Sequence, residues 1–373
     1  MPDFVTDLAF LTAVLVMQVT PGSDMALVNG RGVGQGDRVA LFALLGFTAA
    51  DLIQVPLLVL GIASLLHASP VAFNVMRWGI REWNGDTNGN EGTMTEVFRS
   101  IITLERMAED HFIGAPSPDR GAQTFGGHLL AQALAGAHAT VGDDRRVHSL
   151  HALFLRGGDP AQPLELNVER LRDGRTFTQR NVRAVQNGNE VLRMIASFHV
   201  VEPGEEYAGA RVPDVPPPDE VTLTYTEHTR RESGTTNWPG DVRPMDIRYV
   251  NPPSAPRGVS ITEDQRLWMR ISEPLDDDPA THATGLAYLS DSTLVDHVVL
   301  PHGQRWQDPR LVSASLDHAM WFHRPFRADE WLLFDQRVES TGRGRGLASG
   351  RFFTEAGELA ATCMQEGLIR WDA

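Results

Sequence analysis

The sequence contains an internal duplication in which a helix-like segment is followed by four strand-like segments. An apolar helical pattern covers residues 125–141 in the first copy and residues 281–300 in the second. The segments that follow are short, apolar and bounded by turn residues, as strands are. They cover residues 147–156, 164–172, 176–186 and 191–200 in the first copy, and 312–322, 330–340, 345–354 and 359–369 in the second. One helix followed by hairpin-linked strands favours a curved antiparallel sheet wrapped around that helix, so the duplication predicts an α+β fold of two joined units.

Short motifs support the same alignment of the two copies. Residues 149–159 (SLHALFLRGGD) parallel residues 315–326 (SLDHAMWFHRPF). A turn signal precedes the last strand of each copy, Asn187-Gly188 in the first and Ala356-Gly357 in the second. Residues 204–250 between the copies hold a proline cluster and a polar stretch, which is typical of a long connector. The predicted units are therefore residues 94–203 and 251–373.

The first ninety residues differ from the rest of the chain. Residues 8–19 and 40–66 are apolar, and the second run has the length that a membrane-spanning helix needs. A polar segment rich in Gly and Asn follows, and Met94 then begins a stretch that resembles a native N-terminus. We expect a hydrophobic helical segment over residues 1–83, a linker over 84–93, and a complete protein from residue 94 onward.

Several motifs of this N-terminal segment match one family of membrane proteins. They are Thr20-Pro21-Gly22-Ser23-Asp24-Met25, Gly30-Arg31-Gly32, and the apolar run that ends in His67-Ala68-Ser69-Pro70. The segment resembles the start of the lysine/homoserine exporter family, which has proline where this chain has Ser23. The resemblance fades after about Trp78, so it implies a truncated exporter without transport activity. Membrane association is expected only if residues 1–80 are expressed and inserted.

Composition excludes some classes of protein. Apolar residues make up 42% of the chain and charged residues 22%, as in an ordinary globular protein. The formal net charge of −15 argues against nucleic acid as a partner. Cys363 is the one cysteine, which rules out an internal disulfide framework and suits a reducing compartment. We therefore expect a cytoplasmic location.

The duplicated region, from about residue 95 to 370, resembles the acyl-CoA thioesterase II family of double hotdog enzymes. The matching motifs occur in the same order: Phe125-Gly126-Gly127, residues 154–159 (FLRGGD), residues 171–174 (LRDG), residues 288–291 (YLSD), residues 316–324 (LDHAMWFHR) and Gln365-Glu366-Gly367. The resemblance implies a double hotdog fold, an acyl-CoA substrate, no cofactor and a homo-oligomer.

The resemblance also implies a catalytic trio. In the family an Asp on the second helix, a Thr on the next strand and a Gln on the last strand position the hydrolytic water; here these positions are Asp291, Ser315 and Gln365. A carboxylate can act as general base toward water, while a hydroxyl and a carboxamide orient it. Serine keeps the hydroxyl and lacks only a methyl group. The N–H groups at Gly126 and Gly127, at the start of the first helix, could polarise the thioester carbonyl.

Other interpretations remain open from sequence alone. Arg343 and Arg345 either clamp the CoA phosphates or belong to a solvated hairpin turn. His318 and His323 have opposite parity on a strand and point apart, so we predict no metal site. A hotdog enoyl-CoA hydratase or dehydratase would use a pair such as Asp291 and His297, which lie on poorly aligned faces of a helix. A membrane-tethered protein that only binds acyl-CoA is the third possibility.

Overall fold

A thirteen-stranded antiparallel sheet runs through the part of the chain that the structure describes. The computed structural model describes residues 97–119, 121–233 and 243–371, which belong to one compact unit. The hydrophobic segment predicted over residues 1–83 and the linker over 84–93 lie outside the described residues. Among the described helices, none is long and apolar enough to cross a membrane.

The first half of the described chain contains two helices and six strands. Their bounds are α5 Val97–Ile102, β1 Leu104–Ala108, β2 His111–Gly114, α6 Gly126–His138, β3 Arg145–Phe154, β4 Leu164–Asp173, β5 Phe177–Gln186 and β6 Asn189–Val200.

The second half contains three helices and seven strands. Their bounds are α7 Tyr225–Ser233, β7 Met245–Tyr249, β8 Gln265–Ile271, α8 Pro279–Ser290, α9 Leu294–His297, β9 Leu311–Ser315, β10 Asp317–Phe322, β11 Leu332–Gly342, β12 Arg345–Thr354 and β13 Leu359–Trp371. Short 3₁₀ turns lie at Pro218–Glu220 and Leu300–His302.

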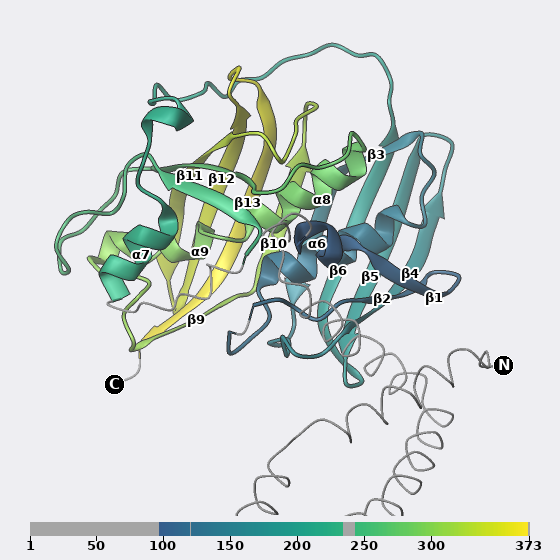
Figure 1. Cartoon of the computed structure of the whole chain (residues 1–373), viewed down its shortest axis with the longest axis horizontal. Coiled ribbons are helices and arrows are strands. Elements are labelled where there is room, and N and C mark those ends of the chain that lie inside the picture. The colour runs from purple at the N-terminus through teal and green to yellow at the C-terminus, as the bar shows by residue number, and fades with distance from the viewer. Residues whose placement is uncertain (1–96, 120, 234–242, 372–373) are drawn as a thin grey trace, which may run out of the picture. The chain divides into compact units, whose positions relative to one another are not determined.

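The sheet order shows how the two halves join. It runs β1-β2-β4-β5-β6-β3-β10-β13-β12-β11-β8-β7, with β9 paired to β13. The junction is the antiparallel pair β3–β10, in which Ala319 lies opposite His151. Figure 1 shows the teal strands of the first half and the green and yellow strands of the second on either side of α6 and α8. Two helix-wrapped sheets joined side by side confirm the predicted double hotdog fold.

The core lies between the sheet and the central helices. Leu130 and Leu134 of α6 are fully buried, as are Leu286 and Leu289 of α8, and both helices belong to one hydrophobic cluster with the inner face of the sheet. These helices pack directly against each other. Because they are buried on nearly every side, their apolar residues do not form a single stripe, as expected of central helices.

The second helix ends earlier than the sequence indicated. A helix over residues 281–300 was expected, but α8 ends at Ser290, Asp291 is its C-cap, and α9 is a separate turn. The hydroxyl of Ser290 donates to the Ala287 carbonyl and that of Ser292 to the Leu289 carbonyl. These hydroxyls donate to carbonyls of the last turn that would otherwise accept from N–H groups of a further helical turn. They thereby favour the end of α8 at this point.

The strand expected over residues 312–322 is two strands. Between β9 and β10, the Leu316 N–H donates to the Glu366 carbonyl, and the Asp317 carboxylate accepts from the Glu366 N–H (2.8 Å). A side chain thus replaces one ladder hydrogen bond, so the strand can bend and pair with β13 on one side and β3 on the other. The predicted connector, residues 204–250, contains α7 and the edge strand β7.

Candidate active site

Asp291, Ser315 and Gln365 lie within hydrogen-bond distance of one another. Gln365 Nε2 donates to Ser315 Oγ (2.9 Å) and, in a short hydrogen bond, to Asp291 Oδ1. Ser315 Oγ lies 3.3 Å from the same carboxylate oxygen. The C-cap of α8, the last residue of β9 and the middle of β13 bring these three groups together from positions up to 74 residues apart.

The start of α6 approaches the carboxylate of Asp291 from the other half of the molecule. The Gly127 N–H donates a hydrogen bond to this carboxylate. A Cβ atom at Gly126 would lie 2.5 Å from Asp291 Oδ2, and one at Gly127 would lie 2.3 Å from the Tyr288 carbonyl oxygen. Only glycine permits this approach, so Gly126 and Gly127 allow the positive end of α6 to face the carboxylate.

The environment of Asp291 sets its protonation. Burial raises the pKa of Asp291 to about 6, although the hydrogen bonds from Gln365, Gly127 and Ser315 and the charge of Arg243 oppose this effect. Loss of hydration disfavours the charged form, which explains the direction. A carboxylate with this pKa is ionised at neutral pH and is more basic than an exposed one, as a general base requires.

A cavity of about 480 Å³ adjoins the trio. Asp291 and Ser315 line it, together with Gly126 at the start of α6. The end of β3 and the loop after it form another wall with Phe154 and Leu155. Main chain, apolar side chains and polar side chains therefore surround a space of the size that binds small molecules.

A second carboxylate lines the same cavity. Tyr225 on α7 donates a short hydrogen bond to Asp296 Oδ2. Burial raises the pKa of Asp296 to about 7, and the charge of Asp291 contributes in the same direction. Two partly buried carboxyl groups in one cavity influence each other's titration, and the raised pKa of Asp296 follows in part from this repulsion.

Arg243 is one of the cavity residues that sequence reasoning missed, as are Tyr225 and Asp296. Its guanidinium donates from Nε (2.9 Å) and Nη2 (2.6 Å) to Asp119 Oδ2, and its Cζ lies 4.0 Å from the centre of the Phe125 ring. Its charge lowers the pKa of both Asp291 and Asp296. Arg243 belongs to the segment expected to be a connector, and no motif marked it.

The other predicted substrate ligands lie elsewhere. Arg343 is in the turn between β11 and β12 with a φ of 53°, and Arg345 Nε donates to Glu366 Oε1 (2.9 Å). Neither lines the cavity beside the trio. These contacts are those of a hairpin turn, which was the alternative interpretation of this segment.

The histidines expected to point apart do so. His318 is buried, with Nε2 2.9 Å from Ser290 Oγ, whereas His323 Nε2 lies 2.9 Å from Thr362 Oγ1 near the surface. Within residues 97–119, 121–233 and 243–371, no three His, Cys, Asp or Glu side chains are grouped as metal ligands.

Comparison with protein families matches three parts of the chain. The acyl-CoA thioesterase N-terminal domain matches residues 115–199, and the acyl-CoA thioesterase C-terminal domain matches residues 213–369. The LysE type translocator model matches residues 15–80, which confirms the resemblance of the N-terminal segment to exporters.

Known proteins match the duplicated region over nearly their whole length. The human protein named acyl-coenzyme A thioesterase 8 is 35% identical, covering 77% of this chain and 93% of its own. Acyl-CoA thioesterase 2 of Haemophilus influenzae is 34% identical, covering 74% of this chain and 99% of its own. The crystal structure of acyl-CoA thioesterase II TesB2 from Mycobacterium marinum is 40% identical, with a TM-score of 0.61 over 74% of this chain and 99% of that one.

Proposed function

The chain belongs to the acyl-CoA thioesterase II family, and from this membership we propose that it hydrolyses acyl-CoA to free fatty acid and CoA with a water held by Asp291, Ser315 and Gln365. The observation that carries the proposal is the hydrogen-bonded cluster of these three side chains beside a cavity that Asp291 and Ser315 line. Besides acyl-CoA, the reaction consumes only water, so the proposal requires no cofactor.

Asp291 acts as the general base. The water oxygen bonds to the thioester carbonyl carbon while the water proton passes to the Asp291 carboxylate. The tetrahedral intermediate then expels the CoA thiolate as the C–S bond breaks, and the thiolate takes up a proton. General base catalysis of this kind contributes roughly 10²–10⁴ in rate.

Ser315 and Gln365 orient the water and the base. Gln365 Nε2 donates to both Asp291 and Ser315, so it fixes the carboxylate and the hydroxyl relative to each other. A hydroxyl can donate and accept, so Ser315 can hold a water against the carboxylate. Loss of orientation within a packed site typically costs orders of magnitude in rate.

The start of α6 stabilises the oxyanion. The first N–H groups of a helix have no intrahelical acceptor, and they carry about half a positive charge in total. Gly127 donates to Asp291, and the Gly126 N–H polarises the thioester carbonyl. Removal of one oxyanion donor typically costs about 10²–10³ in kcat.

The hydratase alternative does not fit the contacts of His297. Its Nε2 lies 3.1 Å from the Tyr249 hydroxyl, and its Nδ1 lies 2.6 Å from Gln336 Oε1. Burial lowers the pKa of His297 to about 4. Both ring nitrogens are thus engaged in a buried network, so His297 cannot pair with Asp291 to move a proton on an enoyl chain.

A substrate comparison tests the proposed reaction. The full-length chain is assayed with palmitoyl-CoA for release of free thiol, and with crotonyl-CoA for loss of the conjugated enoyl absorbance. We expect thiol release from palmitoyl-CoA and no hydration of crotonyl-CoA. Hydration without thiol release would establish the hydratase alternative, and binding without either reaction would establish a protein that only binds acyl-CoA.

A further inference from the structure

The duplication places a second cavity at positions equivalent to the first. The cavity beside the trio lies between the start of α6, the end of α8, the loop after β3 and β9. A cavity of about 520 Å³ lies between the start of α8, the end of α6, the loop after β10 and the start of β3. Each element around the first cavity corresponds to an element of the other copy around the second one. We therefore call the cavity of about 520 Å³ the pseudosymmetric cavity.

The pseudosymmetric cavity lacks a general base at the equivalent position. The C-cap of α8 is Asp291, whereas the C-cap of α6 is Ala139. The two carboxylates that line the cavity are engaged in ion pairs, Glu202 with His199 (3.3 Å) and Asp277 with Arg327 (2.6 Å). The cavity can therefore hold a ligand without hydrolysing it.

One part of its wall is apolar. Val147 and Val200 come from β3 and β6, and Ala283 comes from α8. Phe322 and Phe326 stack with ring centres 6.4 Å apart beside them. An alkyl chain placed against these side chains would leave water, at about 25 cal/mol per Å² of apolar area.

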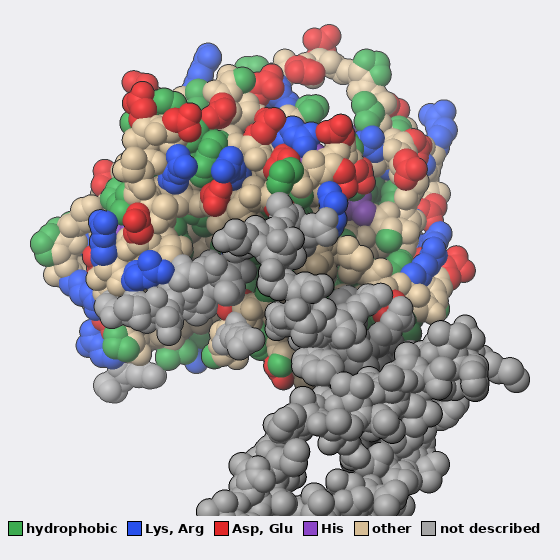
Figure 2. Space-filling model, viewed as in Figure 1, with side chains coloured by type: hydrophobic (Ala, Val, Ile, Leu, Met, Phe, Trp, Pro, Cys, Tyr) green, Lys and Arg blue, Asp and Glu red, His purple; other side chains and the backbone are tan. Residues whose placement is uncertain are grey.

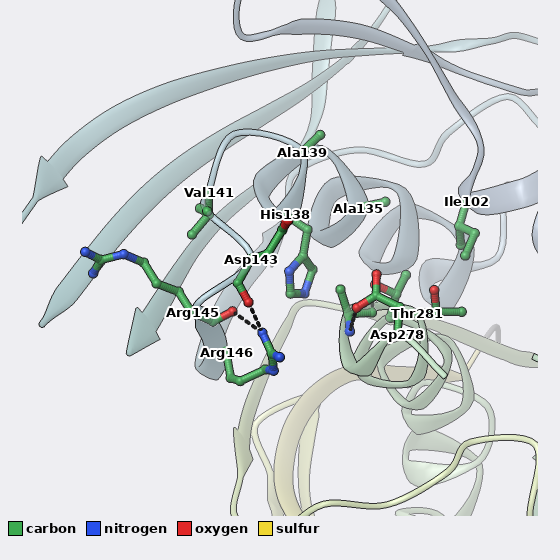
Figure 3. Close-up of a pocket in the computed structure, with 13 residues that line it drawn as sticks. Ile102, Ala135, His138, Ala139, Val141, Asp143, Arg145, Arg146, Asp278 and Thr281 are labelled. Atoms are coloured by element: carbon green, nitrogen blue, oxygen red, sulfur yellow. Dashed lines mark hydrogen bonds between the residues drawn. The ribbon is translucent and has the colours of Figure 1, made fainter. Parts of the chain in front are cut away.

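The polar part contains a cation and an imidazole with unused hydrogen-bonding capacity. Arg146 Nη1 donates to the carbonyls of Asp143 and Arg145, and no ion pair joins Arg146 to a carboxylate of the described residues. His138 Nε2 is buried and has no hydrogen-bond partner. Figure 3 shows both side chains between the end of α6 and α8, at the wall shared with a neighbouring cavity of about 560 Å³.

Most of the remaining polar side chains of the cavity already have partners. His148 Nε2 lies 2.8 Å from Ser197 Oγ, and His323 Nε2 lies 2.9 Å from Thr362 Oγ1. Arg324 Nε lies 3.6 Å from a Glu206 carboxylate oxygen. Asp278 lines the neighbouring cavity only, where it accepts from the Ala280 N–H. His282 Nδ1 accepts from the Ala328 N–H, whereas its Nε2 is buried without a partner. Arg146 therefore remains for an anionic head group, together with the imidazoles of His138 and His282.

We propose that the pseudosymmetric cavity binds a fatty carboxylate, with the alkyl chain on the valine and phenylalanine wall and the carboxylate on Arg146 and His138. Such a ligand matches the site because an unpaired buried imidazole can donate to an acceptor from the tautomer that carries the proton on Nε2, and a guanidinium binds a carboxylate with charge-assisted hydrogen bonds. The choice of ligand rests on the proposed function, whose product is a fatty acid. The presence of the cavity does not depend on the proposed function.

Equilibrium dialysis with dodecanoate tests the proposal on the full-length chain. The variants are Arg146→Met and His138→Phe, which keep the apolar bulk of each side chain. The matched control is His323→Phe, the same change in the same cavity at a ring that already has a partner. We expect the wild type and the control to bind one equivalent of dodecanoate in this cavity with an affinity at least about tenfold higher than that of either variant. Thiol release from palmitoyl-CoA should stay near the wild-type rate in all of them.

Two outcomes would overturn the proposal. One is equal dodecanoate binding by wild type and by both variants. The other is binding of dodecan-1-ol as tight as that of dodecanoate, which would leave no role for the cation. A failure of the proposed function is separable from these outcomes, since it would appear as unchanged thiol release in Asp291→Asn, whatever the dialysis result.

Discussion

At the scale of single residues, Asp291 combines a functional requirement with a cost to stability. Its pKa of about 6 means that ionisation at neutral pH is less favourable in the folded chain than in the unfolded one. A pKa difference of one between the two states corresponds to about 1.4 kcal/mol, so the cost at neutral pH is of order 3 kcal/mol. The hydrogen bonds from Gln365, Gly127 and Ser315 keep the cost from being greater.

The raised pKa predicts how stability changes with pH. Below the unfolded value near 3.8, Asp291 is protonated in both states and the cost is absent; it develops as the pH rises through about 6. Asp291→Asn should therefore raise the melting temperature at pH 7.5, with little effect at pH 4. Thermal unfolding at both values is the measurement. If Asp291→Asn stabilised the chain equally at both pH values, the Asp291 carboxylate would not be the cause of the cost to stability.

Arg243 should set the acidic limb of the pH profile. Its charge lowers the pKa of Asp291, so Arg243→Gln should move the acidic limb of kcat/KM from about 6 to higher pH. The sign follows because a base with a higher pKa remains protonated to a higher pH. Arg257→Gln, a change to an arginine that pairs weakly with Asp308, is the control. An unmoved limb in Arg243→Gln would exclude this coupling.

At the scale of elements, the approach of α6 to α8 builds the site. Gly126→Ala would place a Cβ atom 2.5 Å from Asp291 Oδ2, so we expect a loss of at least about tenfold in kcat and about 1–3 kcal/mol in stability. Gly136→Ala in the same helix is the matched control, since its Cβ would meet no atom closer than 3.5 Å. Equal activity in the two variants would contradict a role for this close approach. Thiol release and thermal unfolding are the measurements.

The duplicated pattern predicted most elements of the fold, because each helix and strand carries its own local signal. The hairpin strands from β4 to β6 and from β11 to β13 lie close to their predicted bounds. The end of α8 was missed because its apolar residues continue into α9, and the stop depends on the hydroxyls of Ser290 and Ser292.

The site was predictable to a different degree for each residue. Asp291, Ser315 and Gln365 were identified through family motifs, and the structure places their side chains together. Arg243 carries no local pattern, because its position depends on a contact with Asp119, 124 residues away. Long-range pairing of this kind leaves no periodic trace in one sequence.

At the scale of the whole molecule, the described unit holds the entire proposed site. On the face in Figure 2, basic and acidic side chains are interspersed. Leu153 and Ile195 of β3 and β6 are exposed by 54% and 46%. Because they lie on the outer face of the sheet, we propose that this face contributes to a homo-oligomer.

Truncation tests the domain division. Residues 94–373 alone should fold and release thiol from palmitoyl-CoA near the full-length rate. Their mass by light scattering should correspond to two or more chains. The reason is that every residue of the proposed site lies after Met94. A folded but inactive truncation would mean that residues 1–93 contribute to activity. A folded truncation with the mass of a single chain would contradict the oligomer.

The most direct test of the proposed reaction is thiol release from palmitoyl-CoA by the wild type and by Asp291→Asn. The amide keeps the size of the side chain and removes the base, so we expect kcat to fall by about 10²–10⁴. Asp219→Asn, the same change at an exposed carboxylate, should leave kcat unchanged. A folded Asp291→Asn variant that retains wild-type turnover would contradict the assignment of Asp291 as the base.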